Sequence, residues 1–222
     1  MNCCGHCQAA ERHFGPTMAR RDMARYHRKG PDATTRHLLG LICELDLHEV
    51  TLLDIGAGVG VIHHELIGRS IGRAVHVEAS DAYLAEARGE TARRGHSAQV
   101  RFVQGDVVDR VDELEQAAVV TLDRVICCYP DYATLIARSA EKAGRYYGMS
   151  VPRDRWYVRA VVAIENFVRR LKGDTFRTFV HPTDALDRLL REAGFVRRAH
   201  RTTMAWTVSL YVRLTAGRSR ES

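Results

Sequence analysis

A glycine-rich turn preceded by an acidic residue is the part of the sequence whose residue types point most directly to chemistry. The apolar run 51–55 contains Asp54 and leads into Gly56, Gly58 and Gly60. Glycines after a strand let the backbone bend sharply and let a ligand approach where a Cβ would block it. A dinucleotide fingerprint has its third glycine where this chain has Val61. The turn therefore predicts a ligand with a cationic end near Asp54 rather than a pyrophosphate.

Two further carboxylates follow the next two predicted strands. Glu78 ends the second strand, and Asp106 comes directly after the third. The Glu78 carboxylate can accept hydrogen bonds from both hydroxyls of a ribose, and Asp106 can accept one from an adenine amino group. With Asp54, they fit one bound adenosyl amino acid, although each alone could equally be a solvated loop carboxylate.

Short β-rich runs alternating with helical patterns must position these residues. Strands are predicted at 51–55, 74–79, 100–104, 118–122 and 145–151, with helices at 59–69, 81–94 and 132–143. Helices are also predicted at 17–27 and 32–45, before the sheet, and at 156–171 and 183–193, after it. Asp81 and Asp154 are the expected N-caps of two of them. Two extended runs, 195–204 and 206–214, close the chain.

This order predicts an α/β fold: a doubly wound, mostly parallel, seven-stranded Rossmann-like sheet with an antiparallel last strand pair. N-terminal helices precede the sheet, and the helical insertion at about 153–181 is too long for a mere connection, so we interpret it as a lid. The expected organisation is an N-terminal cysteine-containing segment with helices at 1–48, the main domain at 49–216 and a flexible tail at 217–222.

From about residue 51 to 214, the chain resembles the class I S-adenosylmethionine-dependent methyltransferases. The resemblance rests on D-x-G-x-G-x-G at 54–60, the acid at Glu78 and Gly105-Asp106. It implies S-adenosyl-L-methionine as the cofactor. The implied cofactor-binding residues are Asp54, Gly56, Gly58, Gly60, Glu78, Asp106, Val107, Leu122 and Asp123.

The acceptor side is expected after the fourth strand, where Cys127, Cys128 and Tyr129 precede a proline. This Tyr-Pro and the helix-rich insertion are similar to magnesium-protoporphyrin O-methyltransferases, in which histidine stands at the position of Cys128. We expect Cys128 and Tyr129 to face the acceptor, with Tyr26 from an N-terminal helix holding it and His181 as the candidate base. Burial of the two cysteines as small apolar side chains remains the alternative.

Composition narrows the class of protein. The 222 residues carry a net charge of +6 and contain no apolar run long enough to cross a bilayer. No secretory signal is recognised at the start, so a cytoplasmic location is expected, where six cysteines would stay thiols, ligands or catalytic groups. The cluster Cys3, Cys4, His6 and Cys7 lacks a second C-x-x-C, so we expect no metal site there; it is either a thiol-bearing tail or a segment that closes over the pocket.

Three functions fit these observations. The favoured one is methyl transfer, by in-line displacement, to a small molecule that is planar or hydrophobic and carries an acidic group. Methylation of RNA is allowed by the basic charge, but no RNA-binding fingerprint is present and the sequence disfavours a nucleic-acid partner. The third is a non-enzymatic cofactor or metal sensor that uses the N-terminal thiols. The oligomeric state stays open.

Overall fold

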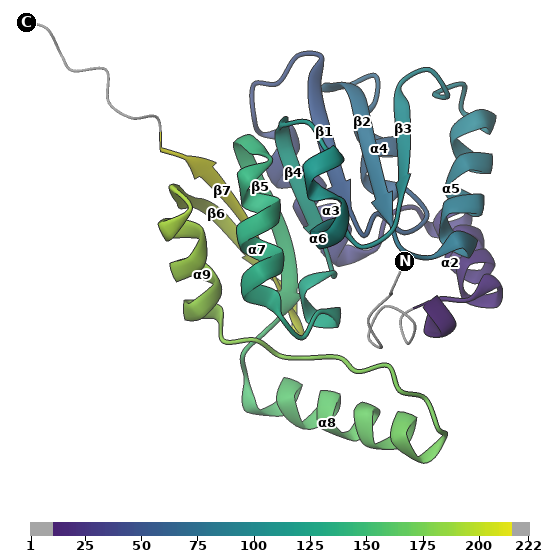
Figure 1. Cartoon of the computed structure of the whole chain (residues 1–222), viewed down its shortest axis with the longest axis vertical. Helices are drawn as coiled ribbons and strands as arrows, with labels where there is room; N and C mark the ends of the chain where they lie inside the picture. Colours follow the sequence, from purple (N-terminus) through teal and green to yellow (C-terminus); the bar gives the residue numbers. More distant parts are fainter. Residues whose placement is uncertain (1–10, 215–222) are drawn as a thin grey trace, which may run out of the picture.

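The computed structural model describes residues 11–214, which build a seven-stranded sheet in the order β3-β2-β1-β4-β5-β7-β6 (Figure 1). The first five strands pair in parallel, and β7 runs antiparallel to both β5 and β6. The predicted mixed sheet with its antiparallel last pair is therefore confirmed. The strands are β1 Val50–Ile55, β2 Ile71–Glu78, β3 Val100–Gln104, β4 Ala117–Asp123, β5 Ala143–Pro152, β6 Phe195–Thr202 and β7 Trp206–Arg213.

Helices cover both faces of this sheet, which is why the central strands read as nearly continuous apolar runs. One face carries α3 Ala33–Cys43 and α4 Val61–Leu66, and the other carries α6 Val107–Arg110, α7 Tyr132–Glu141 and α9 Thr183–Glu192. Near the β3 edge, α2 Pro16–Lys29 packs against α5 Asp81–Arg93 (Figure 1). The sheet order reverses between β1 and β4, where such folds bind ligands at the carboxyl ends of the strands.

The structure corrects two predicted helix starts. Ser80, not Asp81, is the N-cap of α5, and Asp81 is the first helical residue. Helix α8 Trp156–Leu171 begins after Arg155 without a side-chain cap, so Asp154 does not cap it. The Asp154 carboxylate instead accepts a 2.6 Å hydrogen bond from Arg159. The sequence favoured aspartate at both places because aspartate is a strong N-cap in general.

The predicted insertion between β5 and α9 is present and consists of α8 followed by an extended return segment, 174–182. The return segment passes the end of β4, because the backbone N–H of Phe179 donates to the carbonyl of Cys127 at 2.7 Å. Among residues 11–214, no helix has both the length and the apolar character needed to cross a membrane. The cluster Cys3, Cys4, His6 and Cys7 and the predicted tail at 217–222 lie outside the described residues.

Three histidines are buried together between α4 and the sheet. His63 and His64 lie on α4 and His76 on β2; the His63 ring centroid is 4.2 Å from that of His64 and 5.2 Å from that of His76. Within residues 11–214, none of their ring nitrogens has a hydrogen-bond partner. Burial lowers the pKa of His63 to about 3 and that of His64 to about 2, and it holds the pKa of His76 well below its usual value.

We therefore expect acid to destabilise the fold. The three imidazoles stay neutral in the folded chain but take up protons in the unfolded chain below its pKa of about 6.5, so their contribution is complete above that pH and is lost as the pH falls. Asp54 acts in the opposite direction, because burial raises its pKa to about 7 and the folded carboxyl keeps a proton that the unfolded one releases. Because three groups oppose one, unfolding takes up protons overall, and we expect the unfolding free energy to fall as the pH drops below about 6.5.

Denaturant unfolding measured between about pH 7 and pH 5 tests this slope. The variant His76→Phe should make the slope shallower by about one proton. His48→Gln, at an exposed histidine, is the matched control and should leave it unchanged. An unfolding free energy that is constant over this range would contradict the expectation.

Candidate active site

A cavity of about 440 Å³ opens at the carboxyl ends of the parallel strands. Its walls come from the ends of β1, β2 and β4, from the turn after β3, from residues just before and within α2, and from α8 with its return segment. Eight residues predicted for the site line it: Gly56, Gly58, Glu78, Asp106, Val107, Asp123, Cys128 and Tyr129. The sequence thus brings most of its predicted site residues to one place.

The glycine turn lines the cavity with backbone. Gly56 and Gly58 have φ angles of +59° and +57°, a region that side chains with a Cβ rarely adopt. A Cβ at Gly56 would lie 2.5 Å from a methyl carbon of Val125, so that position tolerates no side chain without a shift of the chain after β4. A Cβ at Gly58 would meet only Tyr83, at 3.7 Å, and would extend into the cavity.

Glu78 is fixed by backbone groups on both of its oxygens. The N–H of Gly58 donates to Oε2 and the N–H of Ser80 donates to Oε1, both at 2.9 Å. Burial raises the pKa of Glu78, while these two N–H groups and that of Ala79 act against the rise. Each carboxylate oxygen can accept a second hydrogen bond, so Glu78 can still receive donors from a ligand in the cavity.

Asp106 caps α6 and also reaches the turn after β4. Its Oδ1 accepts from the backbone N–H of Val108 at 2.9 Å, and its Oδ2 accepts from the hydroxyl of Tyr129 at 2.8 Å. Val107, the first residue of α6, is buried and contributes apolar surface to the same wall. One carboxylate therefore connects the wall after β3 to the turn after β4.

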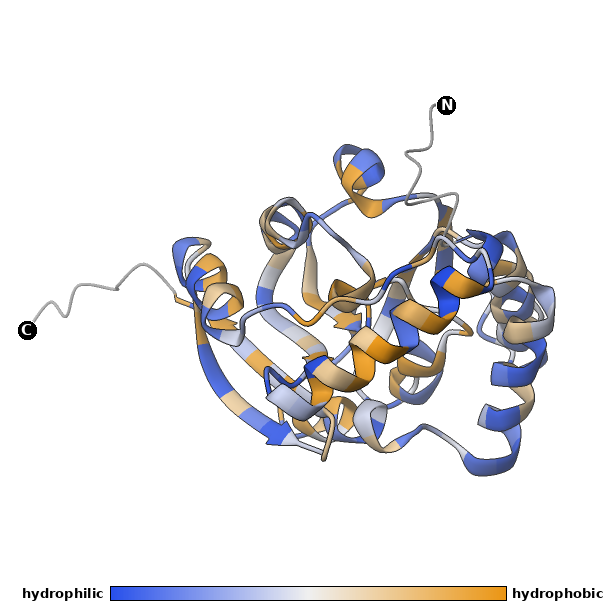
Figure 2. Ribbon diagram, turned by 90° about the horizontal axis from the view of Figure 1, so that it is seen from below, coloured by the Kyte–Doolittle hydropathy of each residue, from blue (hydrophilic) through white to orange (hydrophobic). Residues whose placement is uncertain are grey.

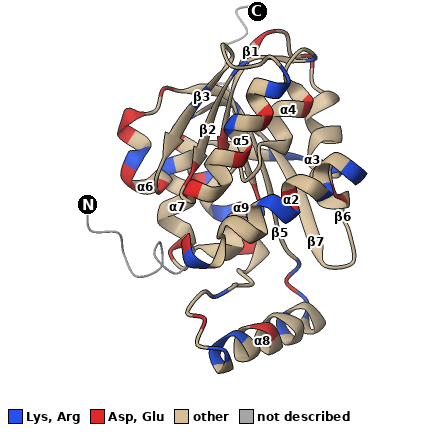
Figure 3. Cartoon of the chain, turned by 90° about the vertical axis from the view of Figure 1, so that its right-hand side faces the viewer, with Lys and Arg blue, Asp and Glu red and all other residues tan. Residues whose placement is uncertain are grey.

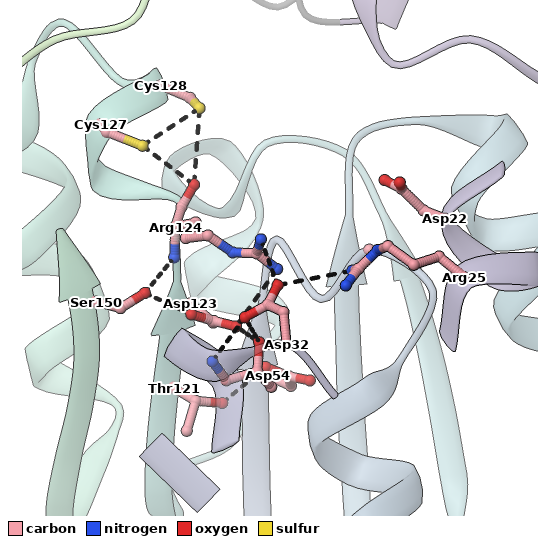
Figure 4. A network of polar contacts seen from close by, with 12 residues as sticks. Asp22, Arg25, Asp32, Asp54, Thr121, Asp123, Arg124, Cys127, Cys128 and Ser150 are labelled. Atoms are coloured by element: carbon pink, nitrogen blue, oxygen red, sulfur yellow. Dashed lines mark hydrogen bonds and ion pairs between the residues drawn. The ribbon is translucent and has the colours of Figure 1, made fainter. Parts of the chain in front are cut away.

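A polar network at the end of β4 holds an N-terminal helix against the sheet (Figure 4). Asp123 accepts from the Thr35 hydroxyl on α3 at 2.6 Å and from the Ser150 hydroxyl on β5. Arg124, which has an unusual φ of +62°, forms an ion pair with Asp32 at 2.7 Å and donates its backbone N–H to Ser150. A non-glycine residue in this conformation is strained, and such strain often marks functional sites.

Asp54 is fully buried at the end of β1 and is not among the cavity-lining residues of the described chain. Its Oδ1 accepts from the Thr121 hydroxyl at 2.7 Å. Its Oδ2 has no hydrogen-bond partner in the described part of the chain and lies 3.8 Å from Nδ1 of His63. Its contact with a cationic ligand stays a prediction.

Two more of the predicted cofactor residues are not brought to the cavity. Gly60 has a φ of +85° at the start of α4, and a Cβ there would lie 2.4 Å from the His63 ring. Its missing side chain makes room for that histidine, and the predicted helix at 59–69 shortens to Val61–Leu66. Leu122 is a fully buried core residue of β4.

The two cysteines form a close thiol pair in the turn Ile126–Cys128. Their Sγ atoms are 3.7 Å apart, and both thiols point to the carbonyl of Arg124, at 3.3 Å from Cys127 and 3.7 Å from Cys128 (Figure 4). Cys127 is buried and Cys128 is half-buried, and both line the cavity. The hydrogen bond from Cys127 lowers the pKa of Cys128, against the effect of burial, and the guanidinium of Arg169 lowers it further.

His181 does not reach the cavity. It is buried, and its Nε2 faces the carbonyl oxygens of Ile126 and Tyr129, each at 3.1 Å. Because both neighbours are acceptors, this nitrogen must carry the proton. Burial lowers the pKa of the ring. His181 therefore ties the return segment to the turn after β4, which does not fit the predicted role as a base.

Tyr26 is also directed elsewhere. Its hydroxyl donates to Glu65 at 2.6 Å and accepts from Arg94 at 2.8 Å, next to a different surface pocket. The residue of α2 that faces the cavity is Asp22, which accepts from the Tyr83 hydroxyl at 2.7 Å. Asp22 and Tyr26 are four residues apart on α2, so the prediction that Tyr26 faces the cavity is wrong by about one helical turn.

Aromatic side chains form one wall of the cavity, and no sequence motif indicates this wall. The rings of Phe14 and Phe176 lie 5.2 Å apart, and the His13 ring stacks on Phe176 at 4.3 Å. His13 also contacts Asp174 at 3.0 Å, although 161 positions separate them. Glu165 and Arg169 of α8 line the same space. No local pattern could reveal a wall built from both ends of the chain.

Comparison with known proteins shows which fold carries this site. A family model described as a methyltransferase domain matches residues 53–142. No curated protein matches the sequence. The magnesium protoporphyrin IX methyltransferase (ChlM) from Synechocystis PCC 6803, solved with bound SAH, is similar at a TM-score of 0.72 and 16% identity, over 93% of this chain and 99% of that one.

Two other solved structures are similar at comparable identity. An O-methyltransferase family protein from Burkholderia thailandensis has a TM-score of 0.69 at 15% identity, over 90% of this chain and 60% of that one. A putative RNA methyltransferase from Pyrococcus horikoshii has a TM-score of 0.58 at 14% identity, over 82% and 84%. The matched residues and the fold identify this chain as an enzyme that contains a methyltransferase domain.

Proposed function

We propose that this enzyme transfers a methyl group from S-adenosylmethionine to a small, largely apolar or planar molecule with an acidic group. The observation that carries the proposal is the Glu78 carboxylate, which is held at the cavity wall by the backbone N–H groups of Gly58 and Ser80. A carboxylate that is already held in place can accept hydrogen bonds from the ribose of an adenosyl donor, and the glycine turn beside it lets the donor approach the backbone closely.

The residues of the cavity fit this donor in three ways. Gly58 leaves open the space that a Cβ would fill, and Glu78 offers acceptors to the ribose hydroxyls. Asp106 and the apolar Val107 lie on the wall where an adenine would be held. Asp54, whose pKa is raised to about 7 by burial, can ionise when a cationic ligand binds above the turn, because a nearby positive charge favours the charged form.

The aromatic and basic residues that line the cavity support the choice of acceptor. Phe14, Phe176 and Trp206 provide aromatic surface, and Arg124 and Arg169 provide positive charge. Aromatic rings suit a flat apolar molecule, and a guanidinium binds a carboxylate through two parallel hydrogen bonds. The similar structure from Synechocystis is a magnesium protoporphyrin IX methyltransferase, and a porphyrin is a planar compound.

When bound, the donor supplies an electrophilic methyl group, and the chain contributes mainly alignment and desolvation. Glu78 and the glycine turn orient the donor side, while Asp106 holds the Tyr129 hydroxyl at the boundary with the acceptor side. The aromatic wall excludes water. Cys128, with its lowered pKa and exposure to the cavity, is the group we propose to contact the acceptor.

Isotope labelling tests the reaction class. A cell extract is incubated with the enzyme and a donor carrying a deuterated methyl group, next to an incubation without enzyme, and both are scanned by mass spectrometry. We expect an acidic small molecule to gain three deuterons, at a rate that changes little with salt. Label recovered in RNA with a steep salt dependence would replace this proposal with RNA methylation.

We expect Gly58→Ala to weaken binding of S-adenosylhomocysteine by about tenfold or more, because the new methyl group occupies space that the ligand needs. Titration calorimetry measures the affinity. Gly68→Ala is the matched control: Gly68 has a φ of +82°, with no atom near its Cβ position, and it does not line the cavity. Both variants bear about 1–2 kcal/mol of the same backbone strain. Equal affinities in the two would contradict our placement of the donor.

We expect Cys128→Ala to lower turnover about tenfold, because the variant loses one polar contact to the acceptor. Its affinity for S-adenosylhomocysteine should stay within about twofold of the wild-type value. The acceptor identified by labelling serves as substrate. Cys43→Ala, at an exposed cysteine remote from the cavity, should change neither quantity. Equal loss of turnover and affinity would instead show that Cys128 only packs the turn after β4.

A further inference from the structure

Helix α8 presents a continuous apolar stripe to solvent. Eight large apolar side chains are exposed among residues 11–214, and six of them lie on this helix. Figure 2 looks onto α8 and shows the hydrophobic colour running along it. The spacing of these residues follows one face of a helix over more than three turns. They are Trp156, Val161, Ile164, Phe167, Val168 and Leu171, and we call them the α8 stripe.

The other side of α8 is the one attached to the protein. Val158 is buried, and the Asn166 side chain donates to the carbonyl of Thr178 at 2.7 Å and accepts from its N–H at 3.0 Å. Arg169 donates to the Thr178 hydroxyl and lines the cavity. The α8 stripe is therefore not the wall of the cavity, and the return segment leaves it uncovered.

The helix lies beyond the carboxyl ends of the strands, at the margin of the molecule (Figures 1 and 3). Its first turn reaches the hairpin between β6 and β7, because the Tyr157 hydroxyl donates to the carbonyl of Met204 at 2.9 Å. The side chain of Met204 is itself 82% exposed. The first turn of α8 thus lies beside another exposed apolar residue.

The charges around the stripe are mostly positive. From 155 to 172 the chain has five basic residues and one acidic residue, Glu165. Within residues 11–214, no ion pair engages Arg155, Arg170 or Lys172, and all three are exposed. The basic side chains stand at both ends of an apolar stripe, which is the pattern of helices that lie in the interface of an anionic membrane.

We propose that α8 binds the surface of a membrane containing anionic phospholipid. The α8 stripe enters the boundary between headgroups and acyl chains, and Arg155, Arg170 and Lys172 contact lipid phosphates. Sixteen helical residues extend about 24 Å, less than the hydrocarbon thickness of about 30 Å, so the helix lies along the surface. The stripe is separate from the cavity, and the proposal holds whichever acceptor the enzyme methylates.

The positive charge favours a lipid surface over a second copy of the chain. Two α8 helices packed stripe to stripe would bring their basic ends together, whichever way they run, because both ends of the helix are basic. Anionic headgroups neutralise the same charges. A second copy is therefore an outcome that the experiment must separate from lipid binding.

Vesicle flotation with the full chain tests the proposal. Vesicles of phosphatidylcholine mixed with phosphatidylglycerol should carry the protein to the top of the gradient, and vesicles of phosphatidylcholine alone should carry about tenfold less. The double variant Ile164→Ser with Phe167→Ser should lose about tenfold of the binding, as should Arg170→Glu with Lys172→Glu. Because these side chains are exposed, the variants should keep the wild-type melting temperature.

Matched controls are available elsewhere on the surface. Leu214→Ser removes an exposed apolar side chain, and Arg188→Glu reverses an exposed charge on α9; both should float like the wild type. Failure to bind the anionic vesicles, or binding that survives loss of Ile164 and Phe167, would overturn the proposal. Light scattering that shows a dimer dissociated by the same double variant, with no flotation, would assign the stripe to a second copy instead.

Discussion

The Glu78 carboxylate and the two backbone N–H groups that donate to it hold three elements in one arrangement. Gly58 belongs to the turn after β1, Glu78 ends β2, and Ser80 caps α5. Charge-assisted hydrogen bonds of this kind are stronger than neutral ones, and here they are partly shielded from solvent. This wall of the cavity is thereby shaped before any ligand arrives, and its electrostatic character is fixed with it.

The residues of the glycine motif divide between two tasks. Gly56 and Gly58 expose backbone to the cavity, whereas Gly60 gives its space to the buried His63 and Asp54 turns its carboxylate toward the interior. The interior under the turn therefore contains imidazoles that have no hydrogen-bond partner within residues 11–214 and that cost stability in acid. It also contains the Asp54 carboxyl, whose raised pKa acts in the opposite direction. The short segment 54–60 therefore both lines the cavity and covers buried polar side chains.

The sheet and most of the residues that line the cavity could be predicted from the sequence because they depend on local patterns: β-rich runs, a glycine turn at a strand end, and acids after successive strands. Asp123 and Glu78 reach the cavity for this reason. Tyr26 and His181 were expected there and are held elsewhere, because helix register and the path of a return segment depend on contacts over long sequence separations. The aromatic wall of Phe14 and Phe176 joins residues from opposite ends of the chain, and no local signal encodes such a pair.

A crystal structure of the enzyme with S-adenosylhomocysteine is the most direct test of how the cavity is used. We predict that the ribose hydroxyls lie within hydrogen-bonding distance of the Glu78 carboxylate, with the ligand passing over Gly58 and its adenine beside Asp106 and Val107. A ligand bound outside this cavity, or a Glu78 side chain that turns away from the ribose, would contradict the assignment of the donor site.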